Sequence, residues 1–392
     1  MRQRFLGIVT VGRSDYGIYR SILDAIRKQR DLAYGLYVGG AHLAPQFGRT
    51  LSEIQRHGHP VTATVEMVAE DDSETAMAGS MARGIEGFCA AFAGKRPDLV
   101  VVLGDRYEMF AAAIAASIQN IPIAHIHGGE VSEGAMDNAF RHSISKFSHF
   151  HFASTALSAR RLGLMGEDPA HIYVTGAPAL DNLAVDHLLG RKELSDQFGV
   201  PVAGDFLLVT YHPETLEPGS ARDQILTIIA ALEEVGMPMV FTLANADPGG
   251  RAINAEIRNR VASTPGMILV ENFGLVPFFS AMSQARAMVG NSSSGIIEAA
   301  SFRLPVVNIG SRQAGRERSA NVLDAECTRD AIRGNLNIAL SASFREKLTG
   351  LVNLYGDGSA APKIVEIIKS VPLNAGVLKK QFHFSAAEDT CR

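Results

Sequence analysis

The sequence predicts an α/β protein built from two doubly wound, Rossmann-like domains with a cleft between them. Short apolar runs, rich in β-branched residues, alternate with helical segments, which is typical of βαβ units and a parallel sheet. The runs stop at glycine and polar residues, as strands of such sheets do. A length of 392 residues is enough for two domains of ordinary size. A cleft between two such domains suits a ligand with two chemically different halves.

Composition and charge exclude several classes of protein. The chain is 46% hydrophobic and 20% charged, so we expect buried cores and not a disordered protein. A formal net charge of -4 gives no electrostatic reason to expect nucleic acid or a membrane as a partner. The three cysteines are far apart in the sequence and indicate neither a disulfide framework nor a metal site. No apolar run reaches membrane-spanning length, so we expect a cytoplasmic protein.

The stretch from Asp98 to His142 organises the first domain. Two apolar runs, 99–103 and 121–126, joined by an alanine-rich helical segment, predict a βαβ unit. Functional groups of such units lie just past the carboxyl ends of the strands, and ionisable side chains gather there. They are Asp105 and Arg106 after the first strand, His127 and Glu130 after the second, and Asp137, Arg141 and His142 in the next segment. Titratable groups at one sheet edge indicate a site that moves protons.

The other elements of the first domain follow from the same patterns. Apolar runs predict strands at 6–10, 32–38, 149–153 and 172–174, and helical patterns cover 18–27, 75–92 and 156–165. The loop after the first strand contains glycine and small polar residues. Its backbone N–H groups can face an anion beside Arg13, although an ordinary turn explains the loop equally well. His42 follows the second strand, and a lone histidine there is more often a structural hydrogen-bonding group than a catalyst.

The crossing to the second domain falls near the start of a charged, helical segment at 183–205, and a second series of alternating strands and helices follows. Its expected strands are 206–210, 238–243, 267–270, 287–289 and 304–309. The run 290–295 is made of small residues between a strand and an expected helix at 296–301. Its backbone N–H groups and hydroxyls, those of Ser292 and Ser293 among them, can face a phosphate, with Arg312 as a second partner. These agreements favour a diphosphate site over a plain serine-rich turn.

Glu298 has two interpretations, because it stands on the first turn of the helix expected at 296–301. A carboxylate is favourably placed near the positive end of a helix dipole. Alternatively, the two carboxylate oxygens accept hydrogen bonds from two vicinal hydroxyls of a sugar. The sequence leaves both interpretations open.

Several motifs together resemble the hydrolysing UDP-N-acetylglucosamine 2-epimerases. These are Gly104-Asp105-Arg106, His125-Ile126-His127-Gly128-Gly129-Glu130, Arg141-His142, Gly290-Asn291-Ser292-Ser293-Ser294-Gly295 and Gly310-Ser311-Arg312-Gln313, with Arg13-Ser14-Asp15-Tyr16 and 39–48 resembling two further loops. The similarity keeps the family's order along the chain as far as about Ser370. It implies a GT-B-like fold. The implied parts are domains at 1–182 and 183–358, a helix at 359–371 that crosses back to the first domain, and a loosely ordered tail at 372–392.

The resemblance implies an enzyme that eliminates UDP from UDP-N-acetylglucosamine through a 2-acetamidoglucal intermediate. Water then adds, so that the products are UDP and N-acetylmannosamine for sialic-acid-type sugar synthesis. No cofactor and no metal are implied, and the family suggests a homodimer or tetramer. Alternatives are hydrolysis of UDP-N,N'-diacetylbacillosamine in the legionaminic acid pathway, a non-hydrolysing epimerase, a GT-B glycosyltransferase and a non-catalytic UDP-sugar-binding protein.

The resemblance also implies roles for single residues. The acid/base positions would be Asp105, His127 and Asp137, with Glu130 beside them, and UDP would be held by Arg13, His212, Asn245, Ser293, Glu298 and Arg312, with Arg106 near the sugar and phosphates. One departure from the family stands out, because several members have glutamate at the position of His127. A histidine can still move a proton near neutral pH. Alternatively, Glu130 assumes that role, or the change marks a subgroup that acts on a different sugar.

Overall fold

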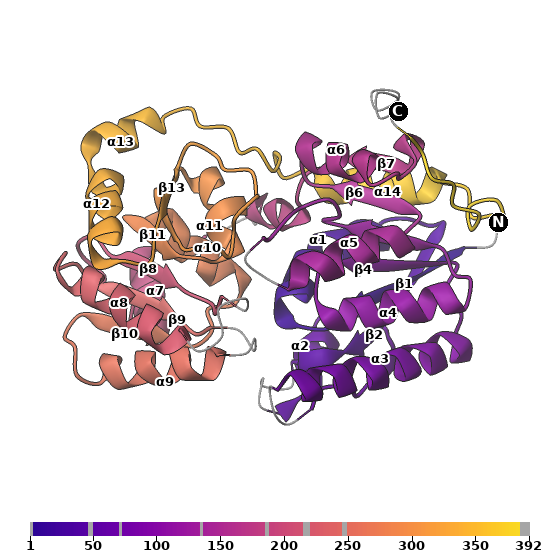
Figure 1. The fold of residues 1–392 in the computed structure, drawn as a ribbon, viewed down its shortest axis with the longest axis horizontal. Coiled ribbons are helices and arrows are strands. Elements are labelled where there is room, and N and C mark those ends of the chain that lie inside the picture. Colours follow the sequence, from indigo (N-terminus) through magenta and orange to yellow (C-terminus); the bar gives the residue numbers. More distant parts are fainter. Residues whose placement is uncertain are drawn as a thin grey trace, which may run out of the picture. The chain divides into compact units, whose positions relative to one another are not determined.

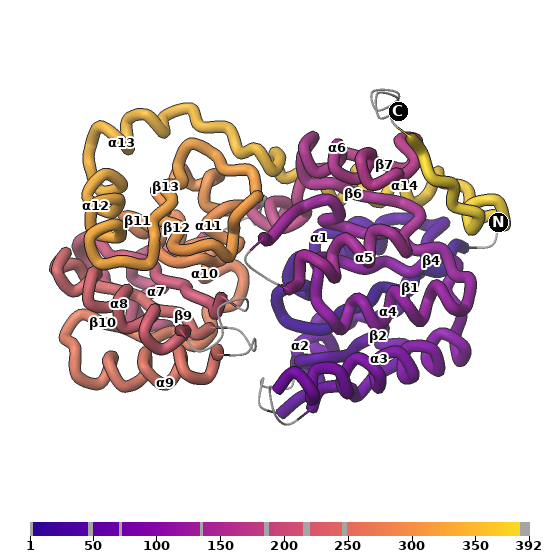
Figure 2. The backbone as a smooth tube through the Cα atoms, viewed as in Figure 1, coloured from indigo at the N-terminus to yellow at the C-terminus, as the bar shows by residue number. Residues whose placement is uncertain are grey.

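The computed structural model describes residues 3–45, 50–69, 73–133, 136–184, 188–214, 220–244 and 249–384. The chain divides into two compact units, whose backbones are drawn in Figures 1 and 2. The first unit comprises 1–130, 137–181 and 355–392, and the second comprises 131–136 and 182–354. Each unit contains one parallel sheet covered by helices, so the predicted pair of doubly wound α/β domains is confirmed.

The first unit is built on a seven-stranded sheet in the order β3-β2-β1-β4-β5-β6-β7. Its strands are β1 (Arg4–Thr10), β2 (Leu32–Gly39), β3 (Val61–Val65), β4 (Leu99–Leu103), β5 (Ile123–Ile126), β6 (Phe150–Ala153) and β7 (Ile172–Val174). All neighbours are parallel, with Leu6 of β1 opposite Leu99 of β4. The strand order reverses between β1 and β4, and ligands of open α/β sheets bind at the carboxyl ends of the strands beside such a reversal.

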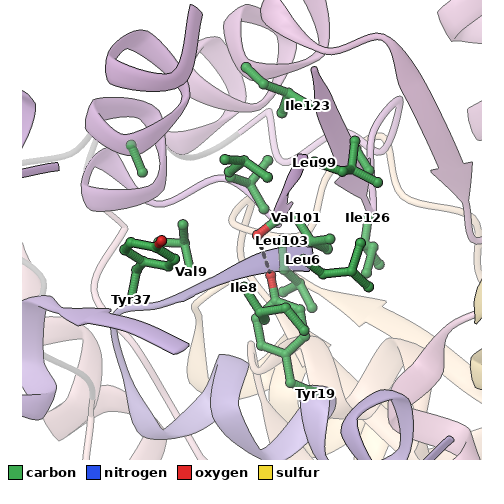
Figure 3. Packing of buried hydrophobic residues seen from close by; sticks show 14 of the residues in the cluster. Leu6, Ile8, Val9, Tyr19, Tyr37, Leu99, Val101, Leu103, Ile123 and Ile126 are labelled. Atoms are coloured by element: carbon green, nitrogen blue, oxygen red, sulfur yellow. Dashed lines mark hydrogen bonds between the residues drawn. The ribbon is translucent and has the colours of Figure 1, made fainter. Parts of the chain in front are cut away.

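The helices of the first unit are α1 (Arg13–Arg27), α2 (Leu51–Arg56), α3 (Glu74–Gly94), α4 (Tyr107–Ile118), α5 (Asp137–Phe147), α6 (Ala156–Leu164) and α14 (Ala360–Ser370). Helix α4 contacts α3 and α5, and α1 contacts α14 (Figure 1). The core lies between these helices and the central strands (Figure 3), where Tyr19 of α1 donates its hydroxyl to the carbonyl oxygen of Val101. Each aliphatic side chain buried here contributes about 1.5–3 kcal/mol of hydrophobic free energy.

The chain returns to the first unit through α14. The carboxylate of Asp181 accepts hydrogen bonds from the backbone N–H groups of Ala360 (2.9 Å) and Ala361 (2.5 Å), which are free donors at a helix start. Burial raises the pKa of Asp181, and those two N–H groups oppose the increase. At the other end of α14, Arg4 donates to the carbonyl oxygen of Val371 at 3.0 Å. Both ends of the helix are therefore held by side chains of the first unit.

The second unit has a six-stranded parallel sheet in the order β10-β9-β8-β11-β12-β13. Its strands are β8 (Leu207–Thr210), β9 (Met239–Thr242), β10 (Met267–Val270), β11 (Ala287–Gly290), β12 (Val306–Ile309) and β13 (Val322–Ala325). Its helices are α7 (Arg191–Phe198), α8 (Ala221–Glu233), α9 (Gly250–Val261), α10 (Leu275–Gln284), α11 (Ser293–Ile297), α12 (Arg329–Leu340) and α13 (Ala342–Lys347). One buried cluster includes residues of α8, α9 and α12, and another includes residues of α7 and α10. The order reverses between β8 and β11.

Two helices begin earlier than the sequence analysis predicts. Helix α1 starts at Arg13 and not at 18, and α11 starts at Ser293 and not at 296. Serine is favoured at the start of a helix because its hydroxyl satisfies a free backbone donor, and Ser292 accepts from the N–H of Ser294 at 3.3 Å. Glu298 therefore lies at the carboxyl end of α11, so the helix-dipole interpretation of this residue is wrong. Among the described residues of 183–205, which leave out 185–187, the α-helix is Arg191–Phe198.

Candidate functional site

Four ionisable residues named by the sequence analysis lie together in the first unit. Arg141, on α5, is 1% exposed, and its guanidinium forms an ion pair with Asp105, which follows β4. The same guanidinium lies 3.6 Å from Oε2 of Glu130 and donates to the carbonyl oxygen of His127 at 3.2 Å. Arg141 therefore links the ends of β4 and β5. A buried arginine in contact with two carboxylates holds both in defined positions.

His127 and Glu130 form a buried pair after β5. Nδ1 of His127 lies 2.5 Å from Oε1 of Glu130, and Ser154, which follows β6, donates its hydroxyl to the same oxygen at 2.6 Å. An ionised carboxylate only accepts, so Nδ1 of His127 carries the hydrogen. Nε2 is buried and has no hydrogen-bond partner among the described residues. With its hydrogen on Nδ1, a neutral imidazole presents a lone pair at Nε2 that can accept a proton.

The turn that carries this pair has an uncommon backbone conformation. His127 has φ +66°, which costs free energy for a residue with a side chain. At Gly129 (φ +75°) a Cβ atom would lie 2.1 Å from the carbonyl oxygen of Ser158, so only glycine fits there. Beneath the turn, His125 contacts the carbonyl oxygen of Gly104 (2.8 Å) and the hydroxyl of Ser145 (3.0 Å). Burial lowers the pKa of His125 to about 3, so it is a neutral support.

The carboxyl end of β1 contributes a second group of polar residues beside β4. Asp15 accepts from the N–H of Val11 (2.7 Å) and from the hydroxyl of Thr10 (2.8 Å). Burial raises the pKa of Asp15, while these bonds and the positive charge of Arg106 lower it. Arg106 directly precedes α4, and its Nε lies 3.2 Å from Glu108. The sequence analysis quoted Asp15 in a motif but gave it no role.

Three other residues of the first unit named in the sequence analysis are Arg13, His42 and Asp137. Arg13 opens α1, is 40% exposed and lies 3.9 Å from Glu53. His42 is buried between the hydroxyls of Thr10 (2.9 Å) and Thr50 (2.5 Å), and burial lowers its pKa to about 4, as expected for a structural histidine. Asp137 is the first residue of α5, one turn before Arg141 and on the same helix face.

In the second unit, Asn291 brings together two of the predicted nucleotide-binding residues, His212 and Arg312. Its side-chain amide accepts from the N–H of His212 (2.7 Å) and donates to the carbonyl oxygen of His212 (2.9 Å). Its own carbonyl oxygen accepts from Gln313 (2.8 Å) and Arg312 (3.5 Å). Asn291 is fully buried, and it directly precedes Ser292, the N-cap residue of α11. The ends of β8, β11 and β12 therefore meet at this residue.

Glycine is required at two positions around Asn291. At Gly290, with φ +131°, a Cβ atom would lie 2.0 Å from the carbonyl oxygen of Thr210. At Gly310, with φ +78°, it would lie 1.8 Å from Oε1 of Glu214. That carboxylate accepts from the N–H (3.0 Å) and the hydroxyl (2.9 Å) of Ser311, which places the residue before Arg312. Sequence reasoning missed Glu214, although it follows β8 closely.

The segment after Glu130 belongs to the second unit. Within 131–136, the N–H of Glu133 donates to the carbonyl oxygen of Ala314 at 3.2 Å, and Arg316 donates to the carbonyl oxygen of Val131 at 3.2 Å. Gly315 leaves no room for a side chain, because its Cβ would lie 2.5 Å from Cγ2 of Val131. Nothing in the sequence pattern indicated these contacts.

Two predicted features lie outside the part of the chain that the structure describes. They are Asn245 and the end of the predicted tail, 385–392.

Among the residues that are described, no group of three or more His, Cys, Asp or Glu side chains is arranged to hold a metal ion. Over the same residues, no helix is long and apolar enough to cross a membrane.

The two sheets, each with its polar cluster at a strand-order reversal, define a two-domain α/β protein of the GT-B-like class. A solved structure supports this class: the UDP-GlcNAc 2-epimerase from Neisseria meningitidis bound to UDP-GlcNAc superposes with a TM-score of 0.80. The match covers 94% of this chain and all of that one, with 19% sequence identity.

Sequence relatives narrow the class to a family. Residues 24–369 match the family model described as UDP-N-acetylglucosamine 2-epimerase. The UDP-N,N'-diacetylbacillosamine 2-epimerase (hydrolyzing) of Legionella pneumophila is 37% identical over 95% of this chain and 97% of its own length. The GDP/UDP-N,N'-diacetylbacillosamine 2-epimerase (hydrolyzing) of Campylobacter jejuni is 35% identical, over 83% of this chain and 85% of its own. The chain belongs to the UDP-N-acetylglucosamine 2-epimerase family.

Proposed function

We propose that this protein is a hydrolysing UDP-sugar 2-epimerase, which converts UDP-N-acetylglucosamine and water into UDP and N-acetylmannosamine. The observation that carries the proposal is the buried group of His127, Glu130 and Arg141, with the partly exposed Asp105 paired to Arg141, beside the strand-order reversal. Inversion at C2 removes a proton from one face of the sugar and returns one to the other, so at least two acid/base groups are needed. Membership of the family supports the same reaction.

The two units divide the work in this proposal. The second carries the residues proposed to hold UDP, which are His212, Asn245, Ser292, Ser293, Glu298 and Arg312. The first carries the acid/base groups, and the family resemblance adds Arg13 and Arg106 as candidates for binding the nucleotide sugar. Loss of UDP from C1, together with removal of the C2 proton, gives 2-acetamidoglucal, whose double bond joins C1 and C2. The charge of the leaving diphosphate is stabilised by the N–H groups at the start of α11 and by the arginines.

We assign proton transfer at one face of C2 to Nε2 of His127, with Glu130 as its positioning residue. Three contacts support this division of roles. Oε1 of Glu130 is occupied by His127 (2.5 Å) and Ser154 (2.6 Å), and Oε2 faces Arg141 at 3.6 Å. Nε2 of His127 is available to a substrate, as far as the described residues show. Asp105 and Asp137 are the candidates for proton transfer at the opposite face, where Arg141 holds the carboxylate of Asp105.

UDP-N,N'-diacetylbacillosamine is the second candidate substrate. It shares the reacting C1–C2 region with UDP-N-acetylglucosamine and differs at C4 and C6. The names of the relatives from L. pneumophila and C. jejuni favour it, whereas the family description favours UDP-N-acetylglucosamine. The values of kcat/KM for the two nucleotide sugars, measured on one preparation by release of UDP, decide between them.

The reaction itself is tested in deuterated water. We expect a free sugar with inverted C2 and deuterium at C2, and one UDP released per sugar. Product that keeps its original C2 hydrogen and configuration would contradict the proposal. A sugar that stays attached to UDP would indicate a non-hydrolysing epimerase, and turnover only with an added acceptor would indicate a glycosyltransferase. Binding of the nucleotide sugar without turnover would indicate a non-catalytic binding protein.

Location and assembly are part of the same proposal. We place the enzyme in the cytoplasm, and we expect a homodimer or tetramer. Native mass spectrometry measures the number of chains directly, and a monomer at micromolar concentration would contradict the expected assembly.

A further inference from the structure

The described part of the C-terminal segment, 372–384, lies against the carboxyl end of α5. The ammonium group of Lys380 donates to the carbonyl oxygens of Lys146 (2.8 Å) and Ser148 (2.5 Å), and it reaches that of Ser145 at 3.4 Å. The last carbonyl groups of a helix have no partner within the helix, and a cation there also interacts favourably with the helix dipole. Lys380 therefore caps α5 from a segment more than 200 residues further along the chain.

A buried carboxylate fixes the position of that ammonium group. Glu167, which is 1% exposed, lies 2.6 Å from the ammonium groups of both Lys380 and Lys146 and 2.9 Å from Nε2 of His151. Burial by itself would raise the pKa of Glu167, but the hydrogen bonds and charges of these partners together lower it to about 2. Glu167 is therefore an anion throughout the working range of pH, and Lys380 is its counterion.

Backbone and ring contacts hold the segment on both sides of Lys380. The N–H of His383 donates to the carbonyl oxygen of Gly166 at 3.1 Å. The ammonium group of Lys146 lies 5.3 Å from the centre of the Phe382 ring, close enough for a cation–π interaction. Gly166 has φ +81°, and a Cβ atom there would lie 2.4 Å from this ring. The segment thus packs closely against the residues that surround Glu167.

Helix α5 connects this contact to the acid/base cluster. Arg141 stands one turn before Ser145, whose carbonyl oxygen Lys380 reaches and whose hydroxyl contacts His125. His125 in turn contacts the carbonyl oxygen of Gly104, the residue before Asp105. A shift of α5 along its axis would therefore move Arg141 relative to Asp105 and Glu130.

We propose that Lys380 is a positioning residue for the reaction: by capping α5 and pairing with Glu167, it sets the placement of Arg141 in the acid/base cluster and of Asp137 one helical turn before it. This inference rests on the proposed function. Catalytic groups displaced by about 1 Å can cost about a hundredfold in rate. Within the described part of the chain, the printed contacts of Lys380 include none of the four residues of this cluster. Its loss should therefore lower kcat and leave KM and the affinity for UDP almost unchanged.

The test compares Lys380→Met with a matched control, Lys379→Met, which removes a neighbouring exposed lysine. We expect Lys380→Met to lower kcat at least tenfold, with KM changed less than twofold, and Lys379→Met to behave like the parent. Lys380→Arg, which keeps the cation, should recover most of the activity. Hydrogen exchange of the peptide 137–148 should accelerate in Lys380→Met, while the peptide 107–118 of α4 should exchange as in the parent.

Two results would contradict this inference. Unchanged exchange in α5 would show that Lys380 does not hold the helix. Faster exchange with an unchanged kcat, corrected for the folded fraction, would reduce Lys380 to a structural residue. If Lys380→Met does not fold, Lys380→Gln, whose amide still donates to a carbonyl oxygen, takes its place in the same comparison. A parent protein that releases no UDP from either nucleotide sugar would refute the proposed function, whereas the exchange experiment would still decide whether Lys380 holds α5.

Discussion

Replacement of Glu130 by glutamine separates the two possible roles of the His127–Glu130 pair. Glutamine keeps the shape of the side chain, and its carbonyl oxygen can still accept from Nδ1 of His127, so the imidazole should stay oriented. What is lost is a negative charge 2.5 Å from the ring, in a place where both residues are at most 5% exposed. That charge strengthens the hydrogen bond that holds the ring in position.

The size of the expected effect follows from this contact. A hydrogen bond to a charged group contributes about 1.5–3 kcal/mol, whereas a neutral one contributes about 0.5–1.5 kcal/mol. Glu130→Gln should therefore weaken the hold on His127 by about 1–2 kcal/mol. If Glu130 only positions His127, the variant should stay active, with kcat/KM lowered by about five- to thirtyfold.

The assay is kcat/KM for UDP release, with Ser154→Ala as a matched variant. Ser154 donates to the same oxygen of Glu130 at 2.6 Å, so its loss removes a hydrogen bond but no charge. Ser154→Ala keeps the carboxylate and its contact with Nδ1 of His127, so its kcat/KM should fall less than that of Glu130→Gln. A Glu130→Gln enzyme without activity would refute the reasoning and make Glu130 the proton acceptor.

Three further predictions follow from single contacts. Asp105→Asn should lower turnover on the order of a hundredfold or more while circular dichroism shows an intact fold, and near-normal turnover would remove Asp105 from the mechanism. Arg312→Ala should weaken UDP binding by roughly 1.5–3 kcal/mol in calorimetry with UDP alone, and unchanged affinity would place the phosphates elsewhere. The pKa of Glu167 in the folded protein is lowered to about 2, so its ionisation stabilises the fold at pH values above the pKa of the unfolded chain, and this stabilisation is lost as the pH falls toward 2. The free energy of unfolding of Glu167→Gln, measured by denaturant titration, should therefore decrease less with falling pH than that of the parent. An equal decrease in both proteins would contradict the assignment.

The central strands were predictable from the sequence, as were the edge strands β7 and β10, whereas the edge strands β3 and β13 were not. The predicted strand 99–103 has the bounds observed for β4, because every residue of a central parallel strand is buried and forms a continuous apolar run. The sequence analysis named no strand at Val61–Val65 or Val322–Ala325. Both are edge strands in which four of five and three of four residues, respectively, are at least partly exposed, so their polar residues hide the pattern.

The same physical reason explains which parts of the candidate site were predictable. Asp105 and His127 follow adjacent parallel strands, so sequence order alone places them at one edge of a sheet, and the structure brings them together around Arg141. Their catalytic roles stay predictions. The segment 131–136 could not be assigned in this way, because its place in the second unit depends on contacts with Ala314 and Arg316, far along the chain.

Ser154 and Lys380 show what local patterns cannot indicate. Each acts through one hydrogen-bonding group on a partner that is distant in the sequence: Ser154 on Glu130, and Lys380 on the last carbonyl groups of α5. A serine after a strand and a lysine in a polar tail are common, so neither residue type carries a signal by itself. Each of them contacts a buried carboxylate, Ser154 that of Glu130 and Lys380 that of Glu167. A buried carboxylate needs hydrogen-bond or charge partners, and these can come from any part of the chain. Buried carboxylates are therefore the positions from which sequence reasoning can be extended: each one predicts partners, and the structure identifies them.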